Sequence, residues 1–214
     1  MARMIKALFL IFEPEAAWNR VALSRRGMTW IVLLYLLPMM LIAAAVQGAG
    51  LVEWGRMQST AIGGLKYFTR NEAILCEIVE LLLMGVVLVA SAHLIKTLGD
   101  TFHGRHTYDQ AFKVVIYGLS PVFLLRLLDG FATTNLWLTW LLGILLTVKI
   151  LYHGVPRIML PDPPHAFGLY FMSCLLLAMA TGLERFITIG FLTGRYKPVE
   201  QFISYLATKL PHGP

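Results

Sequence analysis

Two glutamates inside an apolar run are the side chains best placed to do chemistry. Glu77 and Glu80 lie near the start of the apolar segment 74–95, and their spacing puts both carboxylates on one face of a helix. Arg126, near the end of a later apolar segment, is expected at the same depth. Acids inside a membrane mark proton and cation paths, so one interpretation is a coupling site. The other is a structural ion pair with Arg126.

The stretch HTYDQAFKVVIYGLSP, residues 106–121, begins polar and becomes apolar. Thr107 and Gln110 fit a capping box, in which the glutamine side chain reaches back to the threonine amide. Asp109 and Lys113 have the spacing and order of a favourable helical ion pair. The pair predicts that the lysine enters the apolar zone close to its counterion.

Pro121 ends this stretch and cannot donate an amide hydrogen to the carbonyl of Tyr117. Inside a membrane that carbonyl needs another partner, so we predict a kink that packs on protein rather than lipid. The motif is either a kinked structural helix or a polar lining for a substrate or partner groove. Its candidate residues are Tyr108, Asp109, Lys113, Tyr117 and Pro121.

The composition places these residues in an integral membrane protein. Hydrophobic residues make up 57% of the 214 residues and charged residues 14%, and the mean hydropathy is +0.69. A soluble domain has about 45–50% apolar and about 25% charged residues. The net charge of +6 is explained by lysines and arginines that flank membrane spans. The basic residues are scattered, and we expect no nucleic-acid partner.

Five apolar segments predict an all-α polytopic bundle that forms one domain over residues 1–214. A spanning helix needs about 20 apolar residues, and the third segment is the shortest, because only Val114–Leu125 is free of charge. The fourth ends in KILYHGVP, where Gly154 and Pro156 read as a helix stop. Short interfacial helices are expected before and after the bundle. The predicted spans are 29–50, 74–95, 110–128, 131–152 and 165–184.

The arm before the first span is the most basic part of the chain. We therefore expect the N-terminus in the cytoplasm, and five crossings then place the C-terminus outside. If the third segment did not cross, the C-terminus would lie inside. The expected location is the cytoplasmic (inner) membrane.

Other kinds of site find little support in the sequence. Cys76 and Cys174 lie in apolar runs and predict buried thiols rather than a disulfide. Four histidines have no cysteine or firm carboxylate partner for a metal, so we expect no metal and no cofactor. Catalytic triads, paired glycosidase carboxylates and glycine-rich phosphate loops do not occur in the sequence, and we expect no enzyme. The histidines are His93, His103, His106 and His153.

The order of motifs resembles the Yip family, the Ypt/Rab-interacting five-pass membrane proteins, in its compact bacterial form. The resemblance rests on FEPEAAW, TYDQAFKVVIYGLSPVFLL and KILYHGVPRIM, each followed by or joined to an apolar span. It implies a multispanning helical fold and a role in membrane organisation or trafficking, and it implies no catalytic residues. The chain lacks the long polar N-terminal region of eukaryotic members and their Asp-Leu-Tyr-Gly-Pro-like signature. Small-GTPase binding is therefore unsupported.

Two functions remain open on this evidence. The first is a non-enzymatic scaffold that acts through membrane lipids and through homo- or hetero-oligomers with other membrane proteins. The second is a small transporter or channel component with a polar path near spans two and three. A transporter predicts a water-accessible cavity near mid-membrane, often at broken helices. A scaffold predicts that the charged residues pair with one another.

Overall fold

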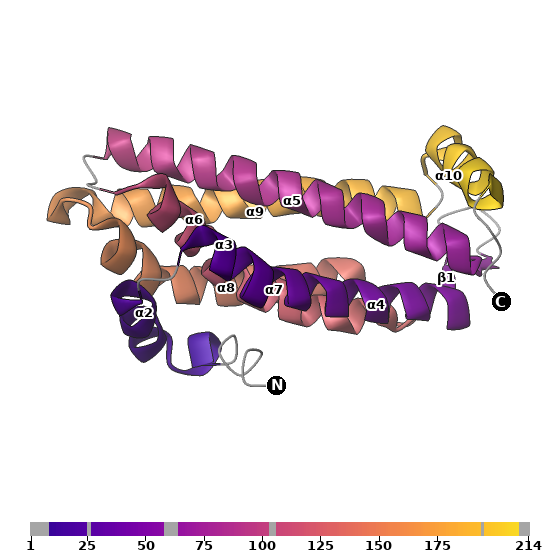
Figure 1. Ribbon diagram of the computed structural model, residues 1–214, viewed down its shortest axis with the longest axis horizontal. Coiled ribbons are helices and arrows are strands. Elements are labelled where there is room, and N and C mark those ends of the chain that lie inside the picture. Colours follow the sequence, from indigo (N-terminus) through magenta and orange to yellow (C-terminus); the bar gives the residue numbers. More distant parts are fainter. Residues whose placement is uncertain (1–8, 25–26, 58–63, 103–105, 194, 210–214) are drawn as a thin grey trace.

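Long helical segments lie side by side in an elongated all-α bundle (Figure 1). The computed structural model describes residues 9–24, 27–57, 64–102, 106–193 and 195–209. In these residues, five segments are long and apolar enough to span a membrane: Met28–Glu53, Arg70–Thr101, Tyr108–Gly130, Leu136–Met159 and Pro163–Leu192. The predicted polytopic fold is therefore confirmed, and the short third segment belongs to the bundle.

A short helix, α2 (Pro14–Leu23), precedes the first span and packs against the fourth. Its Trp18 side chain is fully buried, and the indole nitrogen donates to the Ile150 carbonyl at 3.0 Å. This buried indole fixes α2 to the bundle, so the predicted N-terminal helix is present and anchored.

The first span is a continuous helical run whose hydrogen-bond pattern changes before a proline. It passes from α3 (Met28–Ile31) through a π-helical turn, η1 (Val32–Leu36), into α4 (Leu37–Glu53). The proline that follows Leu37 cannot donate an amide hydrogen. The Leu37 amide donates to the carbonyl five residues back, which is the bond of a π-helical turn.

The second span, α5 (Arg70–Thr101), is the longest helix of the structure. A two-stranded antiparallel hairpin of β1 (Arg56–Met57) and β2 (Leu65–Lys66) leads into it. Thr69 caps its start, because the Thr69 amide donates to Glu72 at 2.9 Å and the Glu72 amide to Thr69 at 3.3 Å. The helix thus begins before the predicted residue 74.

The third span consists of α6 (Tyr108–Gly118), α7 (Ser120–Leu125) and a 3₁₀ turn, η2 (Arg126–Gly130). It is the central element, because 72% of its most apolar 18-residue stretch is buried inside the bundle. The two α-helices meet at Leu119, so the kink predicted before Pro121 is confirmed.

The fourth span, α8 (Leu136–Met159), runs through the sequence KILYHGVP, so the predicted helix stop there is wrong. Gly154 is needed for packing rather than for a cap, because an added Cβ would come within 2.4 Å of the Trp18 ring. Pro156 is tolerated inside the last turns, and the helix ends at Met159, followed by the C-cap Leu160 with a φ of 45°.

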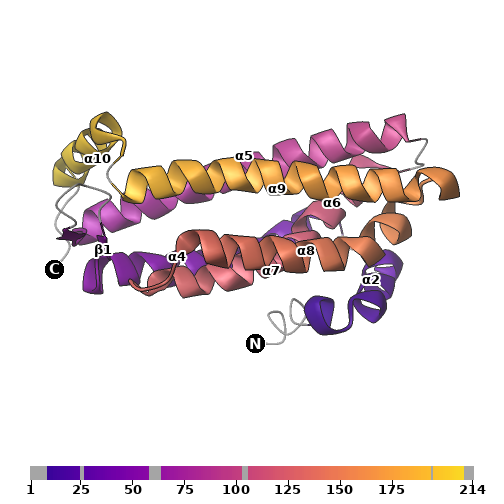
Figure 2. The same cartoon turned by 180° about the vertical axis from the view of Figure 1, so that it is seen from behind.

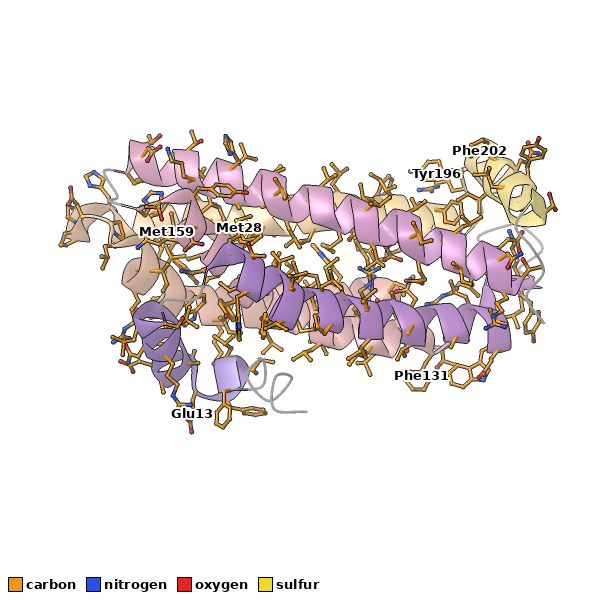
Figure 3. The ribbon with its side chains drawn as sticks, in the orientation of Figure 1. Glu13, Met28, Phe131, Met159, Tyr196 and Phe202 are labelled. Carbon is orange, nitrogen blue, oxygen red and sulfur yellow. The ribbon has the colours of Figure 1, made fainter. Side chains whose placement is uncertain are left out.

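The fifth span joins the turn η3 (Pro163–His165) to α9 (Ala166–Leu192), and the predicted C-terminal helix follows as α10 (Lys197–Lys209). The view from behind shows α8 and α9 along the length of the bundle (Figure 2). Helix α2 and helix α10 lie at opposite ends. In Figure 3, Met28 and Met159 mark the α2 end, and Phe131 and Tyr196 mark the α10 end.

Candidate functional site

The polar start of the third span forms the hydrogen bond and the ion pair that the sequence predicts. The Thr107 amide donates to the Gln110 side chain at 2.8 Å, which is half of the expected capping box. Lys113 and Asp109 form an ion pair at 2.5 Å. Tyr108 stacks on Phe112 with 6.0 Å between ring centroids. These contacts start the helix and hold the lysine beside its counterion.

The kink of the third span is packed on protein side chains. Tyr117 is 4% exposed and Ser120 is fully buried. The Ser120 hydroxyl lies 2.6 Å from the Tyr35 hydroxyl and 3.3 Å from the Ile116 carbonyl, to which it donates. Gly118 lets Leu151 of α8 approach, because an added Cβ would lie 2.7 Å from it. A hydroxyl pair and close helix packing therefore surround the break, as membrane burial demands.

The main charged cluster lies toward the α10 end of the bundle and centres on Arg126. We call Gln47, Glu80, Arg126 and Glu184 the Arg126 cluster. Arg126 forms an ion pair with Glu80, and its Nε donates to Gln47 at 3.3 Å. Gln47 donates to Glu80 at 2.8 Å, and Glu184 lies 4.0 Å from Arg126. The cluster joins spans one, two, three and five, and it includes the structural ion pair that the sequence analysis proposed for Glu80.

A second buried ion pair lies beside the first. Arg185 of α9 contacts Asp129 at 2.5 Å and donates to Thr139 at 2.9 Å and to the Leu136 carbonyl at 3.0 Å. Thr139 also donates to Asp129 at 2.7 Å. We call Asp129, Thr139 and Arg185 the Arg185 cluster. It connects spans three, four and five through charge-assisted hydrogen bonds.

A small cavity lies between the two clusters, and an arginine of the β1–β2 hairpin covers them at the end of the bundle. A cavity of about 10 Å³ lies among Arg126, Thr139, Glu184 and Arg185, which is close to the volume that one water needs. Arg56 of β1 donates to the Asp129 carbonyl at 2.5 Å and to the Thr134 carbonyl at 3.3 Å. Burial lowers the pKa of the Arg56 guanidinium, and the Asp129 carboxylate opposes that change. The hairpin therefore places the buried guanidinium of Arg56 over the end of the bundle.

Glu77 does not join the ion pairs. Its side chain is 6% exposed, and neither carboxyl oxygen has a hydrogen-bond partner among the described residues. The side chain rests on Gly48, where an added Cβ would lie 3.3 Å from Cγ. It forms part of the wall of a groove of about 500 Å³ between α4 and α5. Of the two predicted intramembrane acids, Glu80 is paired and Glu77 is the exception.

Several residues of the clusters were missed by sequence reasoning. The predicted fifth span ends at 184, so Glu184 is its last residue and Arg185 falls outside it, although the helix continues to Leu192. The signal was available, because the apolar sequence FITIGFL follows the Glu-Arg pair. Gln47, Asp129 and Arg56 carry no local pattern, because their partners lie on other helices.

The histidines of the predicted loop serve local contacts where the structure describes them. His93 packs on Tyr108 with 5.9 Å between ring centroids, and a His106 ring nitrogen lies 3.1 Å from the Lys96 carbonyl. His153 packs on Tyr152 at 5.2 Å, and His103 lies outside the described residues. In the described part of the chain, no group of three His, Cys, Asp or Glu is placed to hold a metal.

Comparison with known proteins identifies a family. The sequence pattern of the Yip1 domain matches residues 8–183, a range that holds Glu77, Glu80 and Arg126 and ends just before Glu184. No curated protein and no solved structure matches the chain.

Proposed function

The chain belongs to the Yip1 domain family, and from that premise we propose that it is a non-enzymatic scaffold of the cytoplasmic membrane. It would organise membrane or support trafficking through contacts with lipids and with other membrane proteins. The Yip1 family is not known as enzymatic, which supports a non-enzymatic role.

The observation that carries the proposal is the pairing of buried charges across helices. Arg126 and Arg185 each contact a carboxylate from another span. Paired charges of this kind hold helices together, whereas a conducting path needs polar groups that face water. The helix break near Pro121, where a transporter would place its substrate site, lies among buried apolar side chains such as Leu119 and Val115.

A transport function is the second candidate, and Glu77 is the observation that favours it. Its carboxyl oxygens have no hydrogen-bond partner among the described residues, and it lies in the wall of a groove. Acids inside a membrane mark proton and cation paths. The proposal and this alternative differ in whether ions cross the bilayer.

A flux assay in proteoliposomes separates the two candidates. The purified chain is reconstituted, and proton, sodium and potassium movement is followed with dyes under an imposed potential. A scaffold predicts the leak of empty liposomes for the wild type and for Glu77→Gln. Glu13→Gln, exposed at the start of α2 and outside the groove, is the matched control. Flux that disappears in Glu77→Gln but persists in Glu13→Gln contradicts the scaffold and supports the transporter.

We also propose that the N-terminus lies in the cytoplasm and the C-terminus outside. The basic N-terminal arm and the positions of α2 and α10 at opposite ends of the bundle support this orientation. Reporters fused to each end should read on opposite sides. A C-terminal reporter that reads cytoplasmic contradicts it.

A further inference from the structure

A cavity of about 170 Å³ lies between the N-terminal segment and the third span. It is at the α2 end of the bundle, away from the Arg126 and Arg185 clusters. Its wall includes Phe9, Leu10, Ala17, Arg20, Val21 and Tyr117.

The two ends of this cavity differ in chemistry. Leu10 is 2% and Tyr117 is 4% exposed, so the deep end is apolar and aromatic. Among the described residues of the wall, Arg20 is the one that carries a charge, and it is exposed. Its guanidinium stacks on the Phe9 ring at 5.9 Å. The cavity therefore has the polarity of an amphiphile site, with a cation at the mouth.

The position of the cavity fits the level of lipid headgroups. Helix α5 has 32 residues, a length of about 48 Å, whereas the hydrocarbon core of a bilayer is about 30 Å thick. The ends of the bundle therefore reach into the headgroup layers, where α2 lies. Tyr117 is about 13 Å along α6 from its first residue, so the cavity leads from the headgroup level toward the hydrocarbon.

The surroundings of the mouth favour an anionic partner. Lys149 of α8 is exposed and donates to the Ile11 carbonyl at 3.3 Å, next to the wall residue Leu10. The acid Glu15 of α2 is paired with Arg157 at 3.6 Å, and none of the described residues that line the cavity is an acid. The planar guanidinium of an arginine suits a phosphate, because it can donate two parallel hydrogen bonds to the phosphate oxygens.

We propose that this cavity binds an anionic phospholipid, with one acyl chain inside against Tyr117 and the phosphate on Arg20. A volume of about 170 Å³ takes part of one chain, whereas a partner helix is about 10 Å across and does not fit. The anionic headgroup is attracted to Arg20 and Lys149 together. This inference deepens the proposed scaffold function by naming a lipid class and its site.

Native mass spectrometry of the full chain in detergent tests the headgroup. Phosphatidylglycerol and phosphatidylcholine with the same acyl chains are titrated in parallel. We expect tighter binding of phosphatidylglycerol to the wild type, and a loss of about fivefold in that affinity for Arg20→Gln, the effect of one arginine near an anionic surface. Arg195→Gln is the matched control, because Arg195 stacks on Phe186 at 6.0 Å in the same manner but at the other end of the bundle.

A second pair of variants tests the cavity. Ala17→Phe fills it, whereas Ala22→Phe places the same ring on the exposed side of α2. We expect the first to weaken phosphatidylglycerol binding and the second to leave it unchanged. Should Ala17→Phe fail to fold, Arg20→Gln, an exposed substitution, still decides the headgroup question.

Three results would overturn the inference: equal affinity for the two lipids, an Arg195→Gln loss as large as that of Arg20→Gln, or wild-type binding by folded Ala17→Phe. The outcome is separate from that of the proposed function. If the chain shows no preference for phosphatidylglycerol and the proteoliposomes show no ion flux, the lipid site is contradicted and the scaffold function is not. If the protein conducts ions and lipid binding is as expected, the scaffold function is contradicted and the lipid site is not.

Discussion

Replacing Arg126 with methionine should destabilise the bundle strongly. Arg126 is 6% exposed and faces Glu80 and Glu184. Without it, Glu80 keeps the hydrogen bond from Gln47, but its charge has no partner in the cluster. Breaking a buried ion pair from one side costs about 3–5 kcal/mol. That is a large share of the roughly 5–15 kcal/mol that holds a domain folded.

Equilibrium unfolding in mixed micelles, followed by far-UV circular dichroism, measures this free energy. Arg157→Met is the matched control, because the Arg157–Glu15 pair is partly exposed at 36% and 68% and such pairs contribute about 0–1 kcal/mol. Adding Glu80→Gln to Arg126→Met removes the unpaired charge of Glu80 and should recover on the order of 1–3 kcal/mol. An Arg126→Met loss no larger than that of Arg157→Met would refute the reasoning.

Three further predictions concern helix packing, each read by the same unfolding assay. Gly50→Ala should cost about 1–3 kcal/mol, because its Cβ would sit 1.8 Å from the Gly130 carbonyl oxygen, whereas Gly85→Ala meets nothing within 4 Å and should gain up to about 1 kcal/mol. Trp18→Phe loses the hydrogen bond to Ile150 and should cost about 1–3 kcal/mol; Trp137→Phe, at a site 41% exposed, should change stability by less than about 0.5 kcal/mol. Ser120→Ala and Tyr35→Phe each break the 2.6 Å hydroxyl contact, and each should cost about 0.6–1.7 kcal/mol. If the losses in the double variant were fully additive, the two hydroxyls would not interact.

Features with a local cause could be predicted from the sequence. The apolar runs predict the five spans because a bilayer fixes the length of a helix that crosses it. Asp109 and Lys113 are four residues apart, so their pairing needs only a helix. Pro121 removes an amide, and the break at Leu119 follows from that loss alone.

Features that depend on contacts between distant helices could not be predicted. Trp18 donates a hydrogen bond to a carbonyl 132 residues away, and its ring occupies the space that a Cβ at Gly154 would need. Arg185 and Asp129 are 56 residues apart, and no local spacing connects them. The pairing of Glu80, but not Glu77, with Arg126 depends on the rotation of α5 against α4 and α7, which helical spacing does not specify.

The claim that the kink of the third span is closed to water is tested most directly by cysteine labelling at Ser120. In a variant with Cys76 and Cys174 replaced by alanine, Ser120→Cys and Asp162→Cys are each exposed to a membrane-impermeant maleimide in permeabilised cells. Asp162 lies exposed between α8 and α9, whereas Ser120 is fully buried against Tyr35. A packed scaffold predicts rapid labelling at 162 and protection at 120. Labelling at 120 as fast as at 162 would place water at the helix break and contradict the account.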